Sequence, residues 1–312
     1  MATPMAFFRG QIVPLEQANI NVMTHAFNYG TAVFEGVRGN WNAEQNELYL
    51  FRVEDHVKRI RQSAKIMRMG LRFNDEEAAN IIQQVVEKSG FKEDVYVRPM
   101  IYMSSEIVGV RMHNLEWDFL VYVTPFGSYL DPDQGARCAT SSWRRVDDTE
   151  IPARAKVNGL YVNNAMAKSE AQLNGFDEAI MLNQDGHVSE GSGENIVMIR
   201  NGKLITPAPS DNILEGITLE TALELAAKEM GLSVERRSID RSELYIADEV
   251  FMTGTAAHLT PVVEVDRVPV GDGKPGPISK RLQSLYFSSI TGRQPAYTSW
   301  LTPVYARAGV RA

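Results

Sequence analysis

Residues 187–206 read HVSEGSGENIVMIRNGKLIT, and this stretch gives the clearest indication of the fold class. Apolar, β-forming residues bounded by turn residues predict strands at His187–Ser189, Asn195–Arg200 and Lys203–Thr206. The dipeptide Asn201-Gly202 is typical of a tight hairpin turn, so we expect the last two strands to pair. A glycine-rich turn separates the first two strands. The stretch therefore predicts a sheet built from short strands.

Outward from this sheet, a helix is predicted over Ile217–Met230, because its apolar residues recur at helical spacing and Gly231 supplies a stop. Further helices are expected over 53–69, 75–88, 158–174 and 279–290, and further strands over 29–37, 47–51, 95–103, 118–124, 137–146, 178–182 and 249–253. Residues 7–13 are expected to form two short strands about a tight turn at Arg9-Gly10. The polar segment 127–136 is the best linker candidate. The chain is therefore predicted to be α+β, with two mixed α/β domains at 1–126 and 137–312.

Composition excludes several classes of protein. The chain has 312 residues, more than one hydrophobic core usually spans, and a net charge of −7 without a basic block, which disfavours nucleic-acid binding. No apolar stretch approaches the ~20 residues that cross a bilayer. The histidines form no metal-binding motif, and the one cysteine, Cys138, can form no internal disulfide. We expect a cytoplasmic protein with no metal and with neither a nucleic-acid nor a membrane partner.

Lys156 is the first residue with catalytic potential. It lies in IPARAKVNGLY, residues 151–161, where small and apolar neighbours could leave its amine partly desolvated and therefore nucleophilic. The pattern is weak on its own, since most lysines are solvated surface residues.

Glu190 and two possible anion sites give Lys156 a context. Glu190 lies in the glycine-rich turn, where backbone can approach a ligand closely, although a carboxylate in a turn is more often only solvated. The anion sites are the helix start at Leu214–Thr218 and the small residues 253–257, and each could equally be an ordinary cap or turn. A lysine, a carboxylate and an anion site are together what an enzyme using pyridoxal 5′-phosphate (PLP) needs.

Five segments resemble, in the same order, the fold type IV PLP enzymes and most closely the branched-chain amino acid aminotransferases. They are NYGTAVFEGVR (28–38), YVRP (96–99), AKVNGLY (155–161), SEGSGEN (189–195) and EVFMTGTAA (249–257). The resemblance extends over about residues 8–292. It implies the fold of the type IV PLP enzymes. It also implies a homodimer or higher homo-oligomer, because the family completes its site across the subunit interface.

The resemblance also implies roles at the cofactor. Lys156 would bind PLP covalently and then move a proton, Tyr161 would hydrogen-bond the phenolic oxygen, and Glu190 would pair with the pyridine nitrogen. Leu214 would pack on the ring. The phosphate would be held by Arg59, Gly216, Ile217, Thr218 and Thr255.

The substrates implied are leucine, isoleucine or valine and 2-oxoglutarate, exchanged by a ping-pong mechanism. Arg98 would pair with the γ-carboxylate of glutamate and stay hydrated when an aliphatic chain is bound. The α-carboxylate would bind Thr255, Ala256 and the Tyr96 hydroxyl. The other residues implied for the pocket are Tyr29, Phe34, Arg38 and Tyr129.

Other activities stay open. The segment Gly109–His113 departs from the Gly-Xaa-Asn-Pro-like stretch of branched-chain members, and similar PLP motifs occur in (R)-selective amine transaminases. D-amino acid aminotransferases and aminodeoxychorismate lyases share the fold but carry other residues around Tyr96–Pro99, which disfavours both. A non-catalytic binding protein of this fold would need neither Lys156 nor Glu190.

Overall fold

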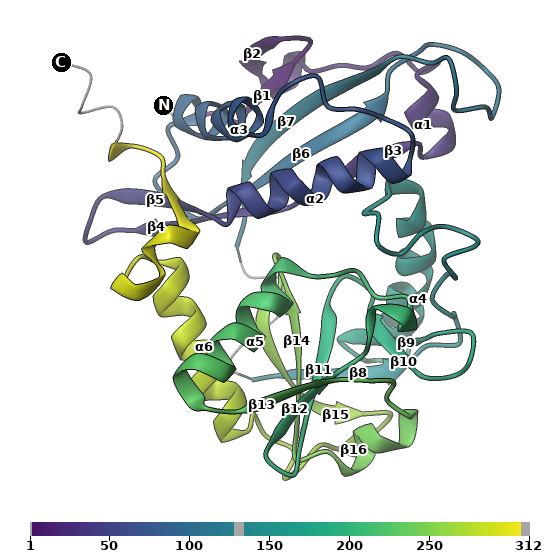
Figure 1. Ribbon diagram of the computed structural model, residues 1–312, viewed down its shortest axis with the longest axis vertical. Helices are drawn as coiled ribbons and strands as arrows, with labels where there is room; N and C mark the ends of the chain where they lie inside the picture. The colour runs from purple at the N-terminus through teal and green to yellow at the C-terminus, as the bar shows by residue number, and fades with distance from the viewer. Residues whose placement is uncertain (1, 128–133, 307–312) are drawn as a thin grey trace. The chain divides into compact units, whose positions relative to one another are not determined.

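The computed structural model describes residues 2–127 and 134–306 (Figure 1). The chain folds into two compact units. Among the described residues, unit 1 contains 2–127, 155–159 and 288–306, and unit 2 contains 134–154 and 160–287.

The continuous second domain predicted at 137–312 differs from unit 2 in two segments. Residues 155–159 pair with unit 1, where Phe34 N donates a hydrogen bond to Lys156 O at 3.0 Å. Residues 288–306 also return to unit 1. Such pairings join residues far apart in sequence, so no local pattern predicts them. The linker predicted at 127–136 includes 128–133, which lie outside the described residues.

Unit 1 is built on an antiparallel sheet with the strand order β17-β5-β4-β6-β7-β1-β2, and β3 also pairs with β6. The strands are β1 (Met5–Phe8), β2 (Gln11–Pro14), β3 (Ala32–Phe34), β4 (Val37–Asn42), β5 (Glu47–Phe51), β6 (Val95–Met103), β7 (Trp117–Pro125) and β17 (Leu301–Pro303). The helices are α1 (His25–Tyr29), α2 (Val53–Ile66) and α3 (Asp75–Ser89), with 3-10 turns η1 (Leu15–Gln17) and η5 (Pro295–Trp300).

The helices of unit 1 follow from their sequences. Helix α2 buries Val57, Ile60 and Ala64, which recur at helical spacing and so form one apolar face. Helix α3 begins with a capping box, in which Asn74 and Glu77 each accept from the other's backbone N–H, and this satisfies two amides that have no intrahelical acceptor.

Unit 2 is built on a mixed sheet with the strand order β10-β9-β8-β15-β14-β11-β12-β13, and β16 pairs with β15. The strands are β8 (Ala136–Thr140), β9 (Glu178–Leu182), β10 (Val188–Gly191), β11 (Asn195–Arg200), β12 (Lys203–Thr206), β13 (Ser233–Arg236), β14 (Glu249–Gly254), β15 (His258–Val265) and β16 (Val268–Pro269). The helices are α4 (Tyr161–Leu173), α5 (Ile217–Met230) and α6 (Pro277–Ile290), with 3-10 turns η3 (Pro209–Asp211) and η4 (Arg241–Ile246). The last residues of α6, from Ser288, and the first two of the 3-10 turn η2 (Asn158–Leu160) belong to unit 1. Helix α4 packs against β9, and α5 packs against β14.

The predicted strands β11 and β12, their pairing and helix α5 are confirmed. The strand predicted at His187–Ser189 is instead β10, Val188–Gly191, so Glu190 lies in a strand and not in the predicted turn. Two predicted strands were too long. The strand expected over 137–146 ends at Thr140, and the one expected over 29–37 is interrupted after helix α1 by Gly30, whose φ is +67°. The strand β15 was missed because Pro261 interrupts its apolar run.

Candidate active site

Lys156 is anchored in unit 1 through its backbone. Its N–H donates to Ser63 Oγ of α2 at 3.2 Å, and its carbonyl accepts from Phe34 N. Its half-buried side chain places Nζ 5.0 Å from the centroid of the Phe34 ring. The backbone around Lys156 is thus fixed while the amine lies over an aromatic ring, a partly desolvated setting that suits a nucleophile.

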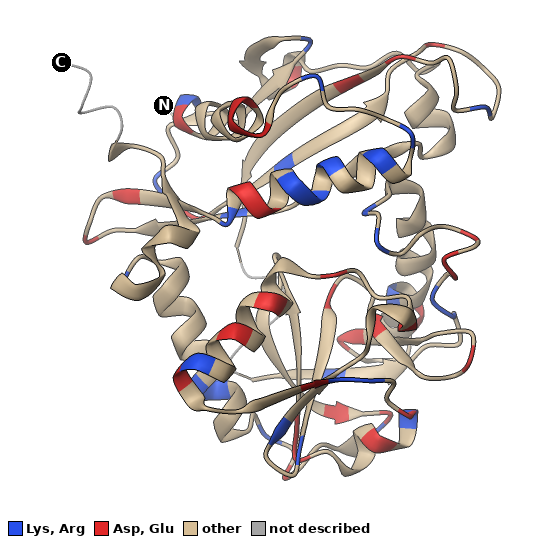
Figure 2. Ribbon diagram, in the orientation of Figure 1, with Lys and Arg blue, Asp and Glu red and all other residues tan. Residues whose placement is uncertain are grey.

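Arg59 extends from α2, the helix on which Figure 2 shows several basic residues. Its Nε and Nη2 each donate to one oxygen of the buried Glu35 at 2.7 Å, and His56 Nδ1 lies 2.7 Å from the same carboxylate. Burial alone would raise the pKa of Glu35, but Arg59 and His56 together hold it well below its usual range. The ionised Glu35 carboxylate can only accept hydrogen bonds, so His56 Nδ1 carries the proton of the bond between them. This carboxylate fixes the direction of the Arg59 guanidinium.

Aromatic and arginine side chains gather on β6 and β3. Arg98 Nη2 donates to Tyr96 OH at 3.0 Å, and its guanidinium lies 4.2 Å from the Phe34 ring centroid. Arg98 Nε is buried and has no hydrogen-bond partner among the described residues. A Cβ on Gly36 would clash with the Tyr96 ring, so only glycine allows this packing. An unsatisfied guanidinium N–H beside aromatic rings is suited to a carboxylate on an otherwise apolar ligand.

Tyr29 and Arg38 make contacts within unit 1. Tyr29 OH accepts from Gly109 N at 2.9 Å, and His25 Nε2 lies 2.8 Å from Gly109 O. The buried Arg38 donates to Gly127 O at 3.1 Å. Tyr29 therefore holds the segment around Gly109 as well as being a candidate wall of the pocket.

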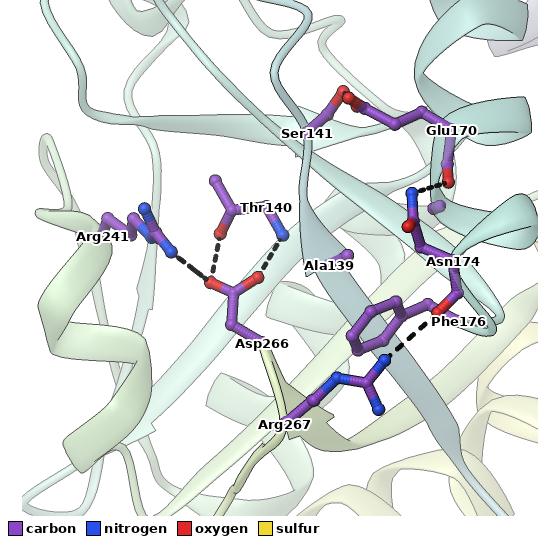
Figure 3. Close-up of a pocket in the computed structure, with 10 residues that line it drawn as sticks. Ala139, Thr140, Ser141, Glu170, Asn174, Phe176, Arg241, Asp266 and Arg267 are labelled. Carbon is purple, nitrogen blue, oxygen red and sulfur yellow. Dashed lines mark hydrogen bonds and ion pairs between the residues drawn. The ribbon is translucent and has the colours of Figure 1, made fainter.

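Unit 2 has a surface cavity of about 350 Å³ that contains none of the predicted site residues (Figure 3). The polar groups that line it are already paired: Asp266 accepts from Thr140 N at 2.6 Å and from Arg241 Nη2 at 2.8 Å. Glu170 likewise accepts from Ser141 Oγ at 2.5 Å. Nothing in this cavity indicates a ligand.

The Glu190 carboxylate is buried in unit 2 and is held by three donors. Arg145 Nη2 lies 2.6 Å from its Oε1, while Asn195 Nδ2 and Leu214 N each donate to its Oε2 at 2.9 Å. Only 2% of the Arg145 side chain is exposed. A buried guanidinium needs an anionic partner, so this arrangement favours an ionised Glu190.

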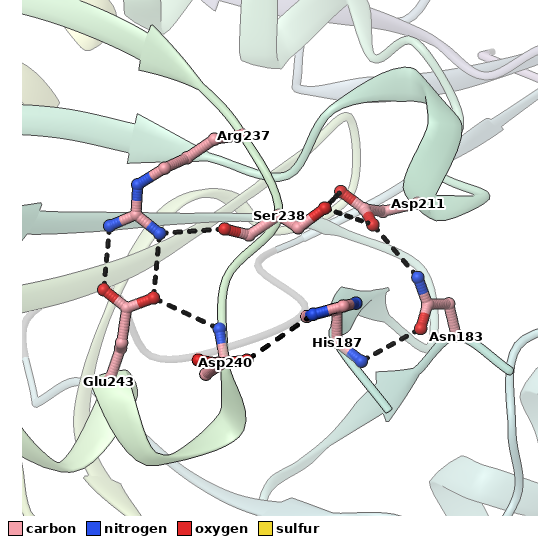
Figure 4. A network of polar contacts seen from close by, with 7 residues as sticks. All are labelled: Asn183, His187, Asp211, Arg237, Ser238, Asp240 and Glu243. Carbon is pink, nitrogen blue, oxygen red and sulfur yellow. Dashed lines mark hydrogen bonds and ion pairs between the residues drawn. The ribbon is translucent and has the colours of Figure 1, made fainter. Parts of the chain in front are cut away.

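A polar network fixes the loop on which Arg145 relies (Figure 4). Arg145 Nε donates to Asn212 O at 3.2 Å. The preceding Asp211 is buried and accepts from Asn183 Nδ2 and Ser238 Oγ, each at 3.0 Å. The network holds the segment that leads from η3 into Leu214.

Helix α5 begins without a side-chain cap among the described residues. Its N-cap is Gly216, and the first-turn N–H groups of Ile217 and Thr218 have no intrahelical acceptor. A Cβ on Gly216 would clash with Asn195 Oδ1, so only glycine fits. An uncapped helix start is suited to a phosphate, and its chemistry fits that group of PLP.

For the other predicted residues the structure gives the position in the fold without contacts that indicate a role. Thr255 and Ala256 follow β14 in the turn to β15, and Tyr161 opens α4. Thr253 Oγ1, next to that turn, is buried without a hydrogen-bond partner in the described part of the chain. Tyr129 lies outside the described residues. The roles of these residues stay predictions.

The predicted site residues thus form one group in each unit. In unit 1, Lys156 and Arg98 both contact Phe34. In unit 2, Glu190 binds the backbone of Leu214. Four residues that hold these groups were missed: Glu35, His56, Arg145 and Asn195. Glu35 and Asn195 lie within the quoted motifs, whereas Arg145 was placed in the strand predicted over 137–146.

Comparisons with known proteins identify the family. Residues 32–265 match the class IV amino-transferase family. A probable branched-chain-amino-acid aminotransferase of Aquifex aeolicus is 49% identical over 300 residues, covering 96% of both chains. The branched-chain amino acid aminotransferase of Thermobaculum terrenum in its PLP form has a TM-score of 0.92 at 37% identity, covering 97% of this chain and 99% of that one. The branched-chain aminotransferase of Thermoproteus uzoniensis with norvaline has a TM-score of 0.92 at 42% identity, covering 96% and 99%.

The chain belongs to the class IV aminotransferase family. The predicted family, the fold type and the assignment as an enzyme are therefore confirmed. Among the described residues, no helix combines the length and apolarity needed to cross a membrane.

Proposed function

We propose that this aminotransferase binds PLP at Lys156 and exchanges the amino group between branched-chain L-amino acids and 2-oxoglutarate by a ping-pong mechanism. The relatives above carry the name of that activity, and the Thermobaculum terrenum structure is a PLP form. A further solved branched-chain aminotransferase, 42% identical to this chain, is complexed with N-(5′-phosphopyridoxyl)-L-glutamate. Glutamate is the amino acid that corresponds to 2-oxoglutarate.

The observation that carries the proposal is the Glu190 carboxylate. Arg145, Asn195 and the Leu214 amide fix its orientation and favour its ionised form. When bound, PLP supplies a carbonyl carbon for an amine and a pyridine ring that accepts electrons. An ionised carboxylate opposite the pyridine nitrogen keeps a proton on that nitrogen, and this is the role we assign to Glu190.

Lys156 is assigned two tasks. Its Nζ would hold the cofactor, and the same amine would take and return the proton at the substrate's Cα. The Phe34 ring near Nζ limits hydration of the amine. Arg59, directed by Glu35, and the uncapped start of α5 are assigned to the phosphate.

Arg98 is assigned to the choice of substrate. Its guanidinium lies over Phe34 and bonds Tyr96, so the same wall offers both an apolar surface and a charge. A γ-carboxylate would find the buried Nε, whereas an aliphatic side chain would contact the rings.

Two further parts of the proposal are a homodimer and a cytoplasmic location. Apolar side chains are exposed in two neighbouring segments of unit 1: Val22 is 73% exposed, Phe27 65% and Val110 80%. The segments are joined by the pairing of Thr24 with Glu106. Covering such side chains with a second subunit removes apolar surface from water. The single cysteine, Cys138, suits a reducing compartment. Sedimentation of an active monomer would overturn the dimer.

The central test is Lys156→Ala. Purified chain supplied with PLP should convert leucine and 2-oxoglutarate to glutamate, and the variant should lose almost all turnover, because no other side chain is assigned to bind and deprotonate. Lys168→Ala is not a suitable control, since Lys168 has a buried partner. Lys228→Ala is a suitable control, because Lys228 lies on the exposed face of α5. Normal turnover by Lys156→Ala would contradict the assignment.

A donor panel separates the alternatives on the same fold. Leucine, isoleucine and valine should be the best amino donors, while both enantiomers of a simple aryl amine and D-alanine should be poor. Release of pyruvate without a keto-acid acceptor would indicate a lyase. Preference for an (R)-amine would replace the proposed substrate class and leave Lys156 in its role.

A further inference from the structure

Asn164 is a buried side chain of helix α4 that none of the roles above uses. Only 5% of the residue is exposed. Its Oδ1 accepts from Arg145 Nη1 at 2.7 Å, and its Nδ2 donates to Ser192 O at 2.6 Å. Asparagine forms helices less readily than alanine, so these two bonds, and not local helix propensity, account for its place in α4. Each end of the amide therefore joins α4 to another part of unit 2.

The first of these bonds acts on the guanidinium that pairs with Glu190. Arg145 Nη2 lies 2.6 Å from Glu190 Oε1. Its Nη1 donates to Asn164 Oδ1, and its Nε donates to Asn212 O at 3.2 Å. In the described part of the chain, Glu190 is the only carboxylate within ion-pair distance of this guanidinium. The two asparagine oxygens are neutral acceptors, so they fix the plane of the guanidinium and leave its charge to Glu190.

The second bond acts on the backbone that follows Glu190. Ser192 lies in the turn between β10, which ends at Gly191, and β11. The turn is closed by Gly191 N, which donates to Glu194 O at 2.6 Å. Asn164 Nδ2 therefore holds the chain two residues beyond Glu190, while the guanidinium holds the carboxylate itself.

Helix α4 begins at Tyr161, the residue predicted to bond the phenolic oxygen of PLP. Asn164 lies three residues further along, so the two side chains leave the helix on neighbouring turns of the same side. The phenolic oxygen and the pyridine nitrogen belong to one rigid ring, so the protein groups that bond them must keep a matching separation. Asn164 connects the helix that carries the first group to both supports of the second.

We propose that Asn164 is a positioning residue for the cofactor. It ties the first turn of α4 to the guanidinium that supports Glu190 and to the turn that follows Glu190, so that Tyr161 and Glu190 keep a fixed separation. The bonds lie within unit 2, whereas their effect on PLP rests on the proposed function. Without the amide, Arg145 Nη1 and Ser192 O each lose a bond in the buried interior, and the guanidinium is free to turn away from Glu190.

Asn164→Ala removes both bonds, and Asn163→Ala is its matched control. Asn163 precedes it on α4, and its Nδ2 donates to Arg144 O at 3.1 Å, so the control removes a bond from the same helix to the same loop. Absorbance titration of the full chain with PLP should give Asn164→Ala a dissociation constant about tenfold above that of wild type, the scale of one buried hydrogen bond. Asn163→Ala should stay within about twofold of wild type. A wild-type dissociation constant in Asn164→Ala would overturn the proposal.

A double-mutant cycle with Glu190→Gln separates positioning from a general loosening of α4. A residue that acts through Glu190 has little left to support once that carboxylate is gone, so the two effects should not add. Asn164→Ala should therefore raise the dissociation constant of PLP about tenfold in wild type but less than about threefold in Glu190→Gln. An equal factor in both backgrounds would show that Asn164 acts on α4 alone, which contradicts the positioning role.

Asn164→Asp covers the case in which Asn164→Ala does not fold. Its carboxylate can still accept from Arg145 Nη1, but it has no donor for Ser192 O, so the turn after β10 loses its tie to α4. Hydrogen–deuterium exchange of the full chain reports this loss, because the Gly191 amide closes that turn. Exchange at this amide should be about tenfold faster in the Asn164 variants than in Asn163→Ala, which should match wild type. Wild-type exchange in the Asn164 variants that fold would rule out the role of the amide.

The exchange measurement also separates this role from the proposed function. Failure of wild type to bind PLP would contradict the proposed function, and amide exchange without PLP would still decide whether Asn164 holds the turn. Normal PLP binding by wild type, together with unchanged exchange in the Asn164 variants, would contradict only the positioning role.

Discussion

Each of the two units buries an arginine–glutamate pair. In unit 1 the glutamate orients the arginine, whereas in unit 2 the arginine orients the glutamate. In unit 1, both oxygens of Glu35 are taken by Arg59, with His56 added, so the carboxylate serves to aim the arginine. In unit 2, Arg145 takes one oxygen of Glu190 and two amide groups take the other. There the arginine supports the carboxylate, and it is the carboxylate to which we assign the pyridine nitrogen. The role of a buried ion pair therefore depends on the groups that surround it and not only on the types of its two residues.

The strongest test of this contrast is Glu190→Gln. The amide keeps the shape but loses the charge assigned to the pyridine nitrogen, so kcat should fall about 100-fold or more. Arg145 would keep its charge without an anionic partner, so the free energy of unfolding should fall by about 3 kcal/mol. Leucine turnover and urea unfolding measure the two effects. A variant with wild-type kcat would remove Glu190 from its role.

The matching change in unit 1, Glu35→Gln, should act on binding instead of turnover. It breaks a two-bond pair, so the free energy of unfolding should also fall by about 3 kcal/mol. Because Arg59 loses its fixed direction, the dissociation constant of PLP should rise about tenfold, the scale of one charged hydrogen bond. Absorbance titration with PLP measures it, and kcat at saturating PLP should change little. If Glu35→Gln lowered kcat by the factor expected for Glu190→Gln, the proposed contrast between the two units would be wrong.

Acid should weaken the Glu35 cluster. Arg59 and His56 hold the pKa of Glu35 below its ordinary value of 4.5 despite burial. Its stabilisation is therefore complete above about pH 4.5 and is lost as pH falls below that. The gap in unfolding free energy between wild type and Glu35→Gln should narrow from about pH 6 to about pH 3. A gap that stayed constant on acidification would show that Glu35 is not ionised in the folded chain.

The smallest effect is expected at an exposed pair. Lys228 and Glu224 lie 2.6 Å apart on α5, with Lys228 61% exposed. Lys228→Gln should lower the free energy of unfolding by about 0.3 kcal/mol and leave turnover unchanged, since solvent screens such a pair. If Lys228→Gln lowered the free energy of unfolding as much as Glu35→Gln does, burial would not explain the difference between the exposed and the buried ion pair.

Much of the local structure could be predicted from sequence. Helix α5 and strand β5 have the predicted bounds, because periodicity and glycine stops are local signals. Arg145 shows where such signals fail. It lies within the strand predicted over 137–146, yet the strand ends at Thr140, and Arg145 pairs with Glu190. Its partner is 45 residues away in sequence, and no local pattern predicts such a contact.

The family and the α+β class could be inferred from sequence alone, because the glycines, lysine and carboxylates of the five motifs are fixed in type and order. The same motifs predict Lys156 and Glu190 as site residues, and these roles stay predictions. The groups that hold those residues became visible only in the folded chain. Folding returned residues 155–159 to unit 1 and directed Arg59 with Glu35. The reason is physical: a buried charge must be paired, and its partner is selected by distance in the folded chain, not by distance along the sequence.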